Sequence, residues 1–312
     1  MYNSDNTILD NLTAHYLKSI FYTITQNNNL YFCFFSYYME RFQVIQPSAH
    51  LAPYVKQYWF ISATDITKGY QRAIPSGYTG LVFNRGKHIL PVTDNHPLPK
   101  AYIFGQILTP VTHTFSDTLD LIIVIFQAAG ARAFFRILMD EIFGMNVPLD
   151  SLNDKRLTEL GNRLINCTDN LLCIYWIESY LSKYLLQTDS LSDRFNMAVN
   201  SINMGERNIQ KLAEQTCLGY KQFKRLFKTN IGLNPKEYIR IIRCSSTLRQ
   251  MLINPATSLE ELAFTAGYYD KSHLIKEVKS FSGYTPSEYQ MNSDPYSDYK
   301  ALFQSVFIDV KQ

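Results

Sequence analysis

The sequence lacks the motifs by which most hydrolytic enzymes and metalloproteins are recognised. It contains no H-E-x-x-H pair, no phosphate-binding loop and no nucleophile elbow. Its five cysteines form no C-x-x-C pair, which predicts neither a zinc site nor a disulfide framework and favours reduced thiols of a cytosolic protein. The scattered histidines show no i, i+4 pairing. We therefore predict no catalytic site, metal or cofactor, although an enzyme with a nucleophilic cysteine stays open as an alternative (Cys33, Cys167 or Cys173).

Long apolar runs and a strong excess of one charge are also missing. The longest aromatic run, LYFCFFSYY at 30–38, is shorter than the roughly 18 apolar residues that a membrane span needs. It follows no basic start and precedes no small-residue cleavage site, so it is a poor signal peptide. Because an ordinary domain start follows from Met39, we expect residues 1–38 to be a dispensable extension. We expect no membrane association and a cytoplasmic protein.

What the sequence does contain is enough apolar material for two cores. The chain has 312 residues, of which 46% are hydrophobic and 18% charged, and this composition is typical of a folded two-domain protein. Strand-like runs divided by Pro and Gly occupy the first half, with a helical pattern near 130–143. The strand-like runs lie at 54–62, 80–84, 101–105 and 119–126.

We therefore predict an α+β protein with a mixed β-rich N-terminal domain and an all-α C-terminal domain. Helical spacing begins near 156, and the polar segment 186–193 interrupts it. We expect a β-rich sensor or dimerisation domain at 39–155 and a helical connector at 156–192. A helical domain at 193–292 and a tail at 293–312 should follow.

The helical half contains an internal repeat. GLNPKEY at 232–238 matches GYTPSEY at 283–289 with an offset of 51, and IQKLA at 209–213 matches LEELA at 259–263 with an offset of 50. Two related units of about fifty residues thus lie in tandem, which predicts a duplicated helical module.

Each unit carries its own start and stop signals. Asp270 is placed as the N-cap of a helix at 271–281, and Gly232 and Gly283 are placed as left-handed stops. Asn-Pro-Lys-Glu at 234–237 and Thr-Pro-Ser-Glu at 285–288 each predict an N-cap, a proline at the first position and a capping box. Such short, tightly punctuated helices are typical of a helix-turn-helix.

With these motifs, residues 195–290 resemble the DNA-binding domain of the AraC family of bacterial transcription regulators. The stretch GYYDKSHLIKEVKSFSGYTPSEY follows the family signature almost throughout. The resemblance implies two helix-turn-helix units joined by a long helix at about 235–252, each placing its second helix in the major groove. More loosely, IPSGYTGLVF (74–83) and VPLDSL (147–152) are similar to the amino-terminal domain of one subgroup.

The resemblance also implies which side chains meet DNA. Matching the base-facing positions are Lys221, Gln222, Lys224 and Arg225 in the first unit, and Ser272, His273 and Lys276 in the second. Ile275 lies in the same outward sector, where a thymine methyl contact and ordinary exposure are both open, and packing or capping competes with a DNA contact for His273. Phosphate contacts, or simple solvation, are expected for Lys228, Arg240, Arg243 and Lys279.

Charge is distributed as DNA binding requires. Residues 195–290 contain 13 Lys and Arg against 8 Asp and Glu, a net charge of +5, whereas the remainder carries −2. We predict a regulator that binds promoter DNA and works with RNA polymerase, with a small-molecule effector and homodimerisation as functions of the first half. The alternative that stays open is a partner- or ligand-binding protein whose helix-turn-helix units no longer bind DNA specifically.

Aromatic residues in the first half have two interpretations. Tyr54, Tyr58, Trp59, Phe60 and Phe83 could line a ligand pocket or pack in the core, and core packing is the commoner role for each.

Overall fold

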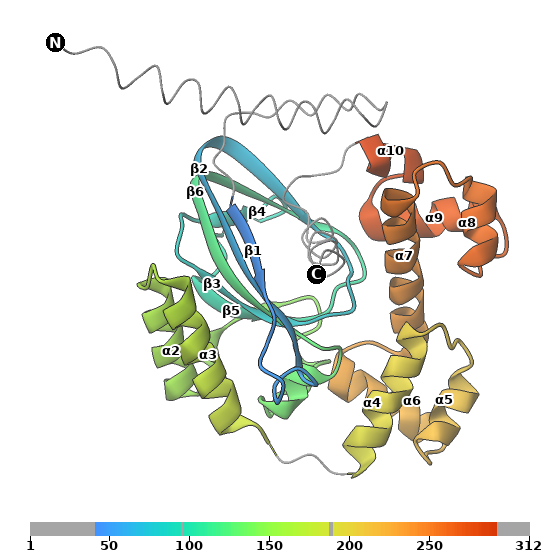
Figure 1. The fold of residues 1–312 in the computed structure, drawn as a ribbon, viewed down its shortest axis with the longest axis horizontal. Coiled ribbons are helices and arrows are strands. Elements are labelled where there is room, and N and C mark those ends of the chain that lie inside the picture. Colours follow the sequence, from blue (N-terminus) through green and yellow to red (C-terminus); the bar gives the residue numbers. More distant parts are fainter. Residues whose placement is uncertain (1–40, 95, 187–189, 292–312) are drawn as a thin grey trace. The chain divides into compact units, whose positions relative to one another are not determined.

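In the computed structural model, a seven-stranded antiparallel sheet precedes a helical half (Figure 1). The structure describes residues 41–94, 96–186 and 190–291, so the expectations for residues 1–38 and for the tail at 293–312 lie outside it. Strand order is β1-β2-β6-β3-β5-β7, and β4 pairs with β6. The strands are β1 (Arg41–Ile45), β2 (Val55–Ala73), β3 (Gly80–Asn84), β4 (Ile89–Pro91), β5 (Ala101–Phe104), β6 (Val111–Phe126) and β7 (Asn146–Pro148).

The sheet is built around the long pair β2 and β6. The pairing between these two strands contains register shifts. All four strand-like runs predicted from the sequence fall on β2, β3, β5 and β6, and the α+β architecture is confirmed. Strands β2 and β6 extend further than predicted, because each of these long strands pairs with more than one neighbour: β6 contacts β2, β3 and β4.

Side chains alternate between the two faces of this sheet, as the pleat of a strand requires. Ile122, Val124 and Phe126 of β6 belong to a core cluster with the helices that follow, whereas Leu121, Ile123 and Ile125 line an internal cavity. The same alternation places Tyr58, Phe60 and Phe83 in the core. It places Trp59 in the cavity wall, together with Val82, Tyr102 and Phe104. Of the five aromatics considered from the sequence, Trp59 therefore faces the cavity.

Two helices cover the core face of the sheet. They are α2 (Lys155–Ile165) and α3 (Asn170–Tyr184), preceded by the short turns η1 (Gly130–Ala133) and η2 (Leu149–Leu152). Leu157, Leu164 and Ile177 share one core cluster with the sheet residues Leu81 and Ile103. The segment expected to act as a helical connector is thus helical and packs on the sheet.

The helix predicted over 130–143 is wrong, since only the single turn η1 forms there. The Arg132 guanidinium donates to the carbonyls of Phe135 and Ile137, which a helix would use for its own backbone bonds. Phe134 and Phe135 are both buried in this stretch. Both rings pack on Phe126, so burial in the core overrides the helical pattern.

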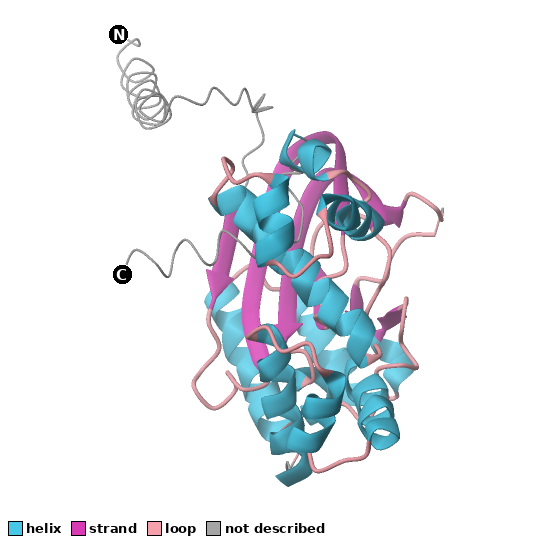
Figure 2. Ribbon diagram, turned by 90° about the vertical axis from the view of Figure 1, so that its right-hand side faces the viewer, coloured by secondary structure: helices cyan, strands magenta, loops and turns pink. Residues whose placement is uncertain are grey.

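The helical half follows as seven helices over residues 190–291 (Figure 2). They are α4 (Ser190–Asn203), α5 (Ile209–Gln215), α6 (Tyr220–Ile231), α7 (Pro235–Ile253), α8 (Leu259–Thr265), α9 (Lys271–Ser282) and α10 (Pro286–Met291). Their apolar faces meet in one cluster that includes Phe223, Phe227, Tyr238, Leu274 and Val278. Figure 1 shows α6 and α9 both beside the long helix α7, which packs against each of them.

Sheet and helical half touch at several places. Arg72 of β2 lies over the Tyr284 ring at 4.2 Å and donates to the Ser282 carbonyl at 3.4 Å. The Met139 amide donates to the carbonyl of Thr229 in α6 at 3.0 Å. Ile74, at the end of the β2 segment, is buried in the apolar cluster of the helices.

Candidate nucleic-acid interface and an internal cavity

The internal repeat becomes a repeat of structure. Helices α5 and α8 each have seven residues, α6 and α9 each have twelve, and α7 and α10 both begin at a proline. Each pair α5–α6 and α8–α9 is a short helix, a tight turn and a longer second helix. The long helix α7 joins the two pairs, as predicted from the sequence.

The predicted caps hold both second helices at defined ends. Asp270 accepts from the His273 amide at 2.7 Å at the start of α9, and α6 and α9 both end at a glycine with positive φ, Gly232 and Gly283. Asn234 and Glu237 exchange two hydrogen bonds of a capping box at the start of α7. These signals are local, which explains why the sequence predicts them correctly.

The turn inside each unit offers a test of the repeat. Gly267 has a φ of +73° and Cys217, at the matching position, has a φ of +55°. Because a β-carbon on Gly267 would contact nothing within 4 Å, only backbone strain opposes a side chain there. We expect Gly267→Ala to lower the free energy of unfolding, and Cys217→Gly to raise it, each by about 1 kcal/mol. Thermal denaturation of both variants measures this; shifts of the same sign contradict it.

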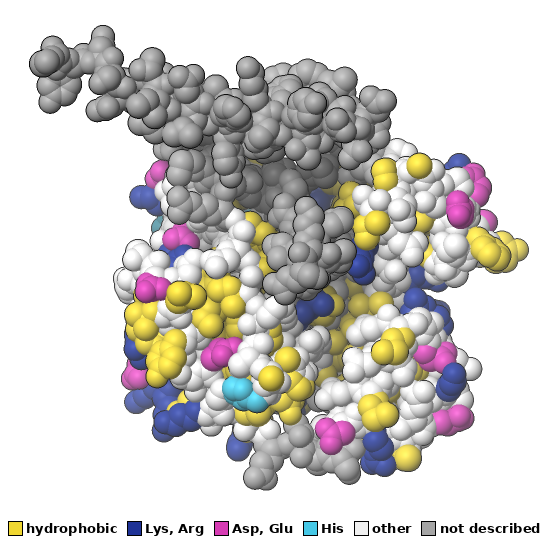
Figure 3. Space-filling view, in the orientation of Figure 1, with side chains coloured by type: hydrophobic (Ala, Val, Ile, Leu, Met, Phe, Trp, Pro, Cys, Tyr) yellow, Lys and Arg dark blue, Asp and Glu magenta, His cyan; other side chains and the backbone are white. Residues whose placement is uncertain are grey.

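Four cationic or amide side chains proposed to meet DNA lie on one exposed side of α6. Lys221, Gln222, Lys224 and Arg225 are all exposed, as is Lys228 one turn later. The Gln222 side chain also accepts from the Gly219 amide at 3.3 Å, which caps its own helix, a role that the sequence analysis did not assign. Figure 3 shows Lys and Arg side chains along the side of the molecule where the two helix pairs lie, interleaved with acidic residues.

The corresponding side of α9 is more mixed. Ser272, Lys276 and Lys279 are exposed, whereas Ile275 is half-buried and packs against the core cluster of the helices. His273 is half-buried too: its ring packs edge-on to Tyr268, with centroids 5.3 Å apart, and its Nδ1 accepts from the Tyr269 amide at 3.4 Å. Packing and capping, one of the two roles considered for His273, are thus present.

Arg240 and Arg243 of α7 converge on Glu277 of α9, a residue that the sequence analysis missed. Glu277 is 3% exposed, and its carboxylate lies 2.8 Å from Arg240 Nε and 2.6 Å from Arg243 Nη2. The Arg243 side chain is itself only 15% exposed. Both guanidiniums therefore bridge α7 and α9, and a phosphate contact for either one stays a prediction. An acidic residue on an otherwise apolar helix face was the available signal for Glu277.

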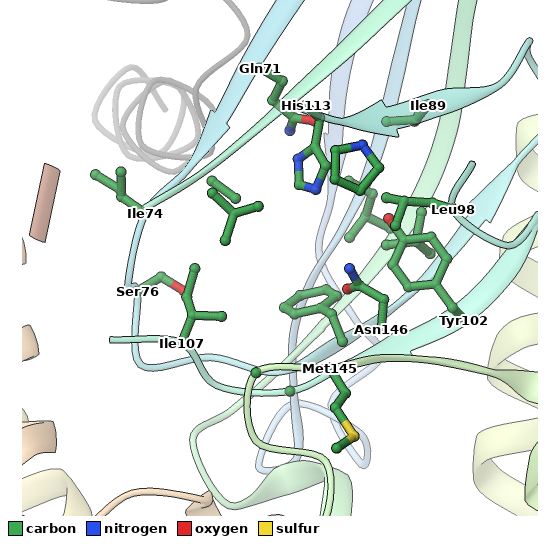
Figure 4. Close-up of a pocket in the computed structure, with 18 of the residues that line it drawn as sticks. Gln71, Ile74, Ser76, Ile89, Leu98, Tyr102, Ile107, His113, Met145 and Asn146 are labelled. Atoms are coloured by element: carbon green, nitrogen blue, oxygen red, sulfur yellow. The ribbon is translucent and has the colours of Figure 1, made fainter. Parts of the chain in front are cut away.

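A cavity of about 350 Å³ lies on the other face of the sheet from α2 and α3 (Figure 4). Figure 4 shows the His113 ring directed into the space that Leu98, Tyr102 and Ile107 bound. His113 is 8% exposed, and burial lowers its pKa to about 4, so the imidazole is neutral near pH 7. Neither His113 Nε2 nor the buried Gln106 Nε2 has a hydrogen-bond partner among the described residues.

Other chemistry finds little support in the described part of the chain. Burial raises the pKa of the Cys173 thiol to about 12, the opposite of an activated nucleophile, and Cys33 lies outside the described residues. No cluster of His, Cys, Asp and Glu in residues 41–291 is arranged to hold a metal ion. Over the same residues, no helix has both the length and the apolar character that a bilayer span requires.

Comparison with known proteins gives matches to both halves. Residues 43–148 match a family described as a domain of unknown function (DUF6597), and residues 212–292 match one described as a helix-turn-helix domain. The chain is 24% identical over 147 residues to an uncharacterized HTH-type transcriptional regulator of Haemophilus influenzae, which covers 45% of this chain and 49% of that protein. It thus spans about half the length of that relative.

Two further similarities extend over more of the chain. The probable transcriptional regulator LumQ of Photobacterium leiognathi is 24% identical over 217 residues, which covers 66% of this chain and 86% of that protein. The solved structure of ToxT from Vibrio cholerae aligns with 14% identity and a TM-score of 0.39, over 75% of this chain and 98% of that one.

Proposed function

We propose that the chain is a transcription regulator of the AraC type and that it binds promoter DNA sequence-specifically through α6 and α9. The observation that carries this proposal is the duplication itself. Two capped twelve-residue helices, each with exposed cationic side chains, are fixed to one connecting helix. Such an arrangement suits two successive major grooves on one face of the duplex, roughly 34 Å apart.

The side chains of α6 and α9 divide into those that contact bases and those that contact phosphates. We assign base contacts on α6 to Lys221, Gln222, Lys224 and Arg225, with Arg225 as the bidentate donor to guanine and Gln222 as the partner of adenine. On α9, Ser272 and Lys276 are the exposed candidates, while His273 and Ile275 reach DNA only at the edge of their packed positions. Lys228 and Lys279 supply phosphate contacts, and Arg240 and Arg243 chiefly hold α9 in place.

The sheet half is assigned to sensing. Ile74, Ser76 and Tyr78 line the cavity, and the same segment reaches the helices: Ile74 enters their core, and a β-carbon on Gly77 would lie 2.9 Å from the Tyr238 ring. A molecule bound in the cavity therefore acts on the wall that contacts α7. RNA polymerase and a second copy of the chain are the protein partners that this function implies, and DNA binding places the protein at the nucleoid.

DNA binding is tested by selecting sites from random duplexes with the full-length chain, followed by footprinting and shift assays over a salt series. The logarithm of the binding constant should fall linearly with the logarithm of the salt concentration, with a slope of about −0.9 for each phosphate neutralised. A chain that protects no selected fragment at low salt, with or without the small molecules tested below, contradicts the proposal and favours helix-turn-helix units that no longer bind DNA.

Arg225→Ala tests the reading of a base. We expect it to weaken binding to the selected site by about 1–3 kcal/mol and to relax the preference at one base pair, because a bidentate guanine contact is lost. Arg249→Ala is the matched control, since Arg249 is an exposed arginine of α7 outside both proposed reading faces. Equal losses on selected and random DNA would show that Arg225 contacts phosphate instead.

A further inference from the structure

The cavity in the sheet is lined almost entirely by neutral side chains. Apolar and aromatic residues of β2 to β6 make most of its wall, and the hydrogen-bonding groups are amides, hydroxyls and one imidazole. No Lys or Arg occurs among the described residues that line it. Lys56 lies over the ring of Tyr78 at 4.9 Å but is not part of the lining, and Asp94 is the one acidic lining residue.

Two buried nitrogen atoms in this wall lack partners among the described residues. Gln106 is 2% exposed and its Nε2 is a donor, while His113 is 8% exposed and its Nε2 donates or accepts according to the tautomer. A buried donor without a partner destabilises the protein. A bound molecule with an accepting oxygen removes that cost, which an entirely apolar molecule does not.

Charge limits what can enter. An ionised group buried without a partner is strongly disfavoured, and the lining offers no cation that would pair with a carboxylate. The imidazole of His113 does not compensate, because its lowered pKa keeps it neutral near pH 7. An ammonium group finds one carboxylate, Asp94, but its Oδ1 is already 2.7 Å from His96 Nδ1. The cavity of about 350 Å³ lies at the small end of ligand sites, which span roughly 300–1,000 Å³.

We propose that this cavity binds a small, uncharged, largely apolar molecule that carries one oxygen acceptor, held by Gln106 and His113. An alcohol or a ketone has this chemistry. The proposal rests on the sensing role assigned to the sheet half and specifies its ligand class. Gln106 also links the bound molecule to the helical half, because a β-carbon on Gly232, at the end of α6, would lie 3.5 Å from the Gln106 side chain.

The test compares four molecules that share one flexible chain and differ in the head group: decanol, decanone, decanoate and decylamine. Each is titrated into the full chain at neutral pH by calorimetry, and the shift in melting temperature is recorded in parallel. We expect decanol and decanone to bind at least tenfold more tightly than decanoate and decylamine. Tighter binding of decanoate or decylamine overturns the proposal, and so does binding of none of the four.

Gln106→Leu tests the head-group contact. The change keeps the side chain similar in size but removes the donor, so decanol affinity should fall about tenfold while the fold, measured by circular dichroism, is retained. Gln127→Leu is the matched control, because the Gln127 amide binds the Ala52 carbonyl and does not line the cavity. Unchanged decanol affinity in Gln106→Leu overturns the assignment. None of these readouts involves DNA, so their failure is separable from a failure of DNA binding.

Discussion

Replacement of Glu277 by Ala is expected to lower the free energy of unfolding by about 3 kcal/mol and to release α9 from α7. The Glu277 carboxylate is buried between two guanidiniums, with Oε1 2.6 Å from Arg243 Nη2 and Oε2 2.8 Å from Arg240 Nε. Removal of one partner from a buried ion pair costs about 3–5 kcal/mol, because the remaining charge is left uncompensated. The low end applies because the Arg240 side chain is 39% exposed and can turn to water.

The functional consequence of Glu277→Ala should be confined to one unit. Since the ion pairs of Glu277 with Arg240 and Arg243 join α9 to α7, binding to the half of the DNA site read by α6 should persist while the half read by α9 is lost. Denaturant titration and shift assays on sites altered in either half measure the two effects. Glu260→Ala is the control: its ion pair with Lys271 at 2.8 Å is exposed to solvent, so its removal should change stability far less. A Glu277 variant as stable as this control would refute the proposed role of the buried pair.

The sequence predicts the helical half well because its signals are local. Asp270, Gly232 and Gly283 act on amides and carbonyls within four residues, so their spacing alone defines where α6 and α9 begin or end. The capping box at the start of α7 works in the same way. The left-handed turn at Cys217 matches Gly267 in the second copy, although a cysteine at that position does not by itself indicate a positive φ.

What the sequence does not predict depends on residues far apart in the chain. Glu277 meets Arg240 across 37 positions, and no local pattern announces that contact. Alternation in β2 predicts that Trp59 and its neighbours Tyr58 and Phe60 lie on opposite faces, but not which face is covered by α2 and α3. The stretch near 130–143 has helical spacing, yet it forms only the single turn η1, and Phe134 and Phe135 both pack on Phe126 of the distant strand β6.

Both second helices pack their apolar faces in one cluster, but the further contacts that hold them differ although the units are copies. Where Arg240, Arg243 and Glu277 hold α9, a cluster of rings holds α6: Phe227 lies 5.6 Å from Phe195 of α4 and 5.5 Å from Tyr238 of α7 between ring centroids. Removal of one partner from a buried ion pair leaves an uncompensated charge, whereas truncation of a packed ring leaves a cavity. The two units should consequently respond to different substitutions.

Phe227→Ala is expected to cost about 3–5 kcal/mol, as large a loss as any single substitution proposed for this chain, because Phe227 is 0% exposed and its removal leaves a cavity among three rings. The loss should fall on the helical half. Both tryptophans, Trp59 and Trp176, lie in the sheet half, so their fluorescence reports that half while far-UV circular dichroism reports the whole chain. In the variant, the dichroism transition should occur at a lower denaturant concentration than the fluorescence transition.

Phe264→Ala is the matched control for this prediction. Phe264, in α8, is 86% exposed, so its removal creates no cavity and should change the free energy of unfolding by less than about 0.5 kcal/mol. Phe227→Leu keeps most of the apolar volume, and we expect it to remain folded while DNA binding through α6 weakens and binding through α9 persists. If Phe227→Ala and Phe264→Ala unfold at the same denaturant concentration, the ring cluster does not position α6. The first reading helix must then be held by its caps and by the contact between Met139 and Thr229.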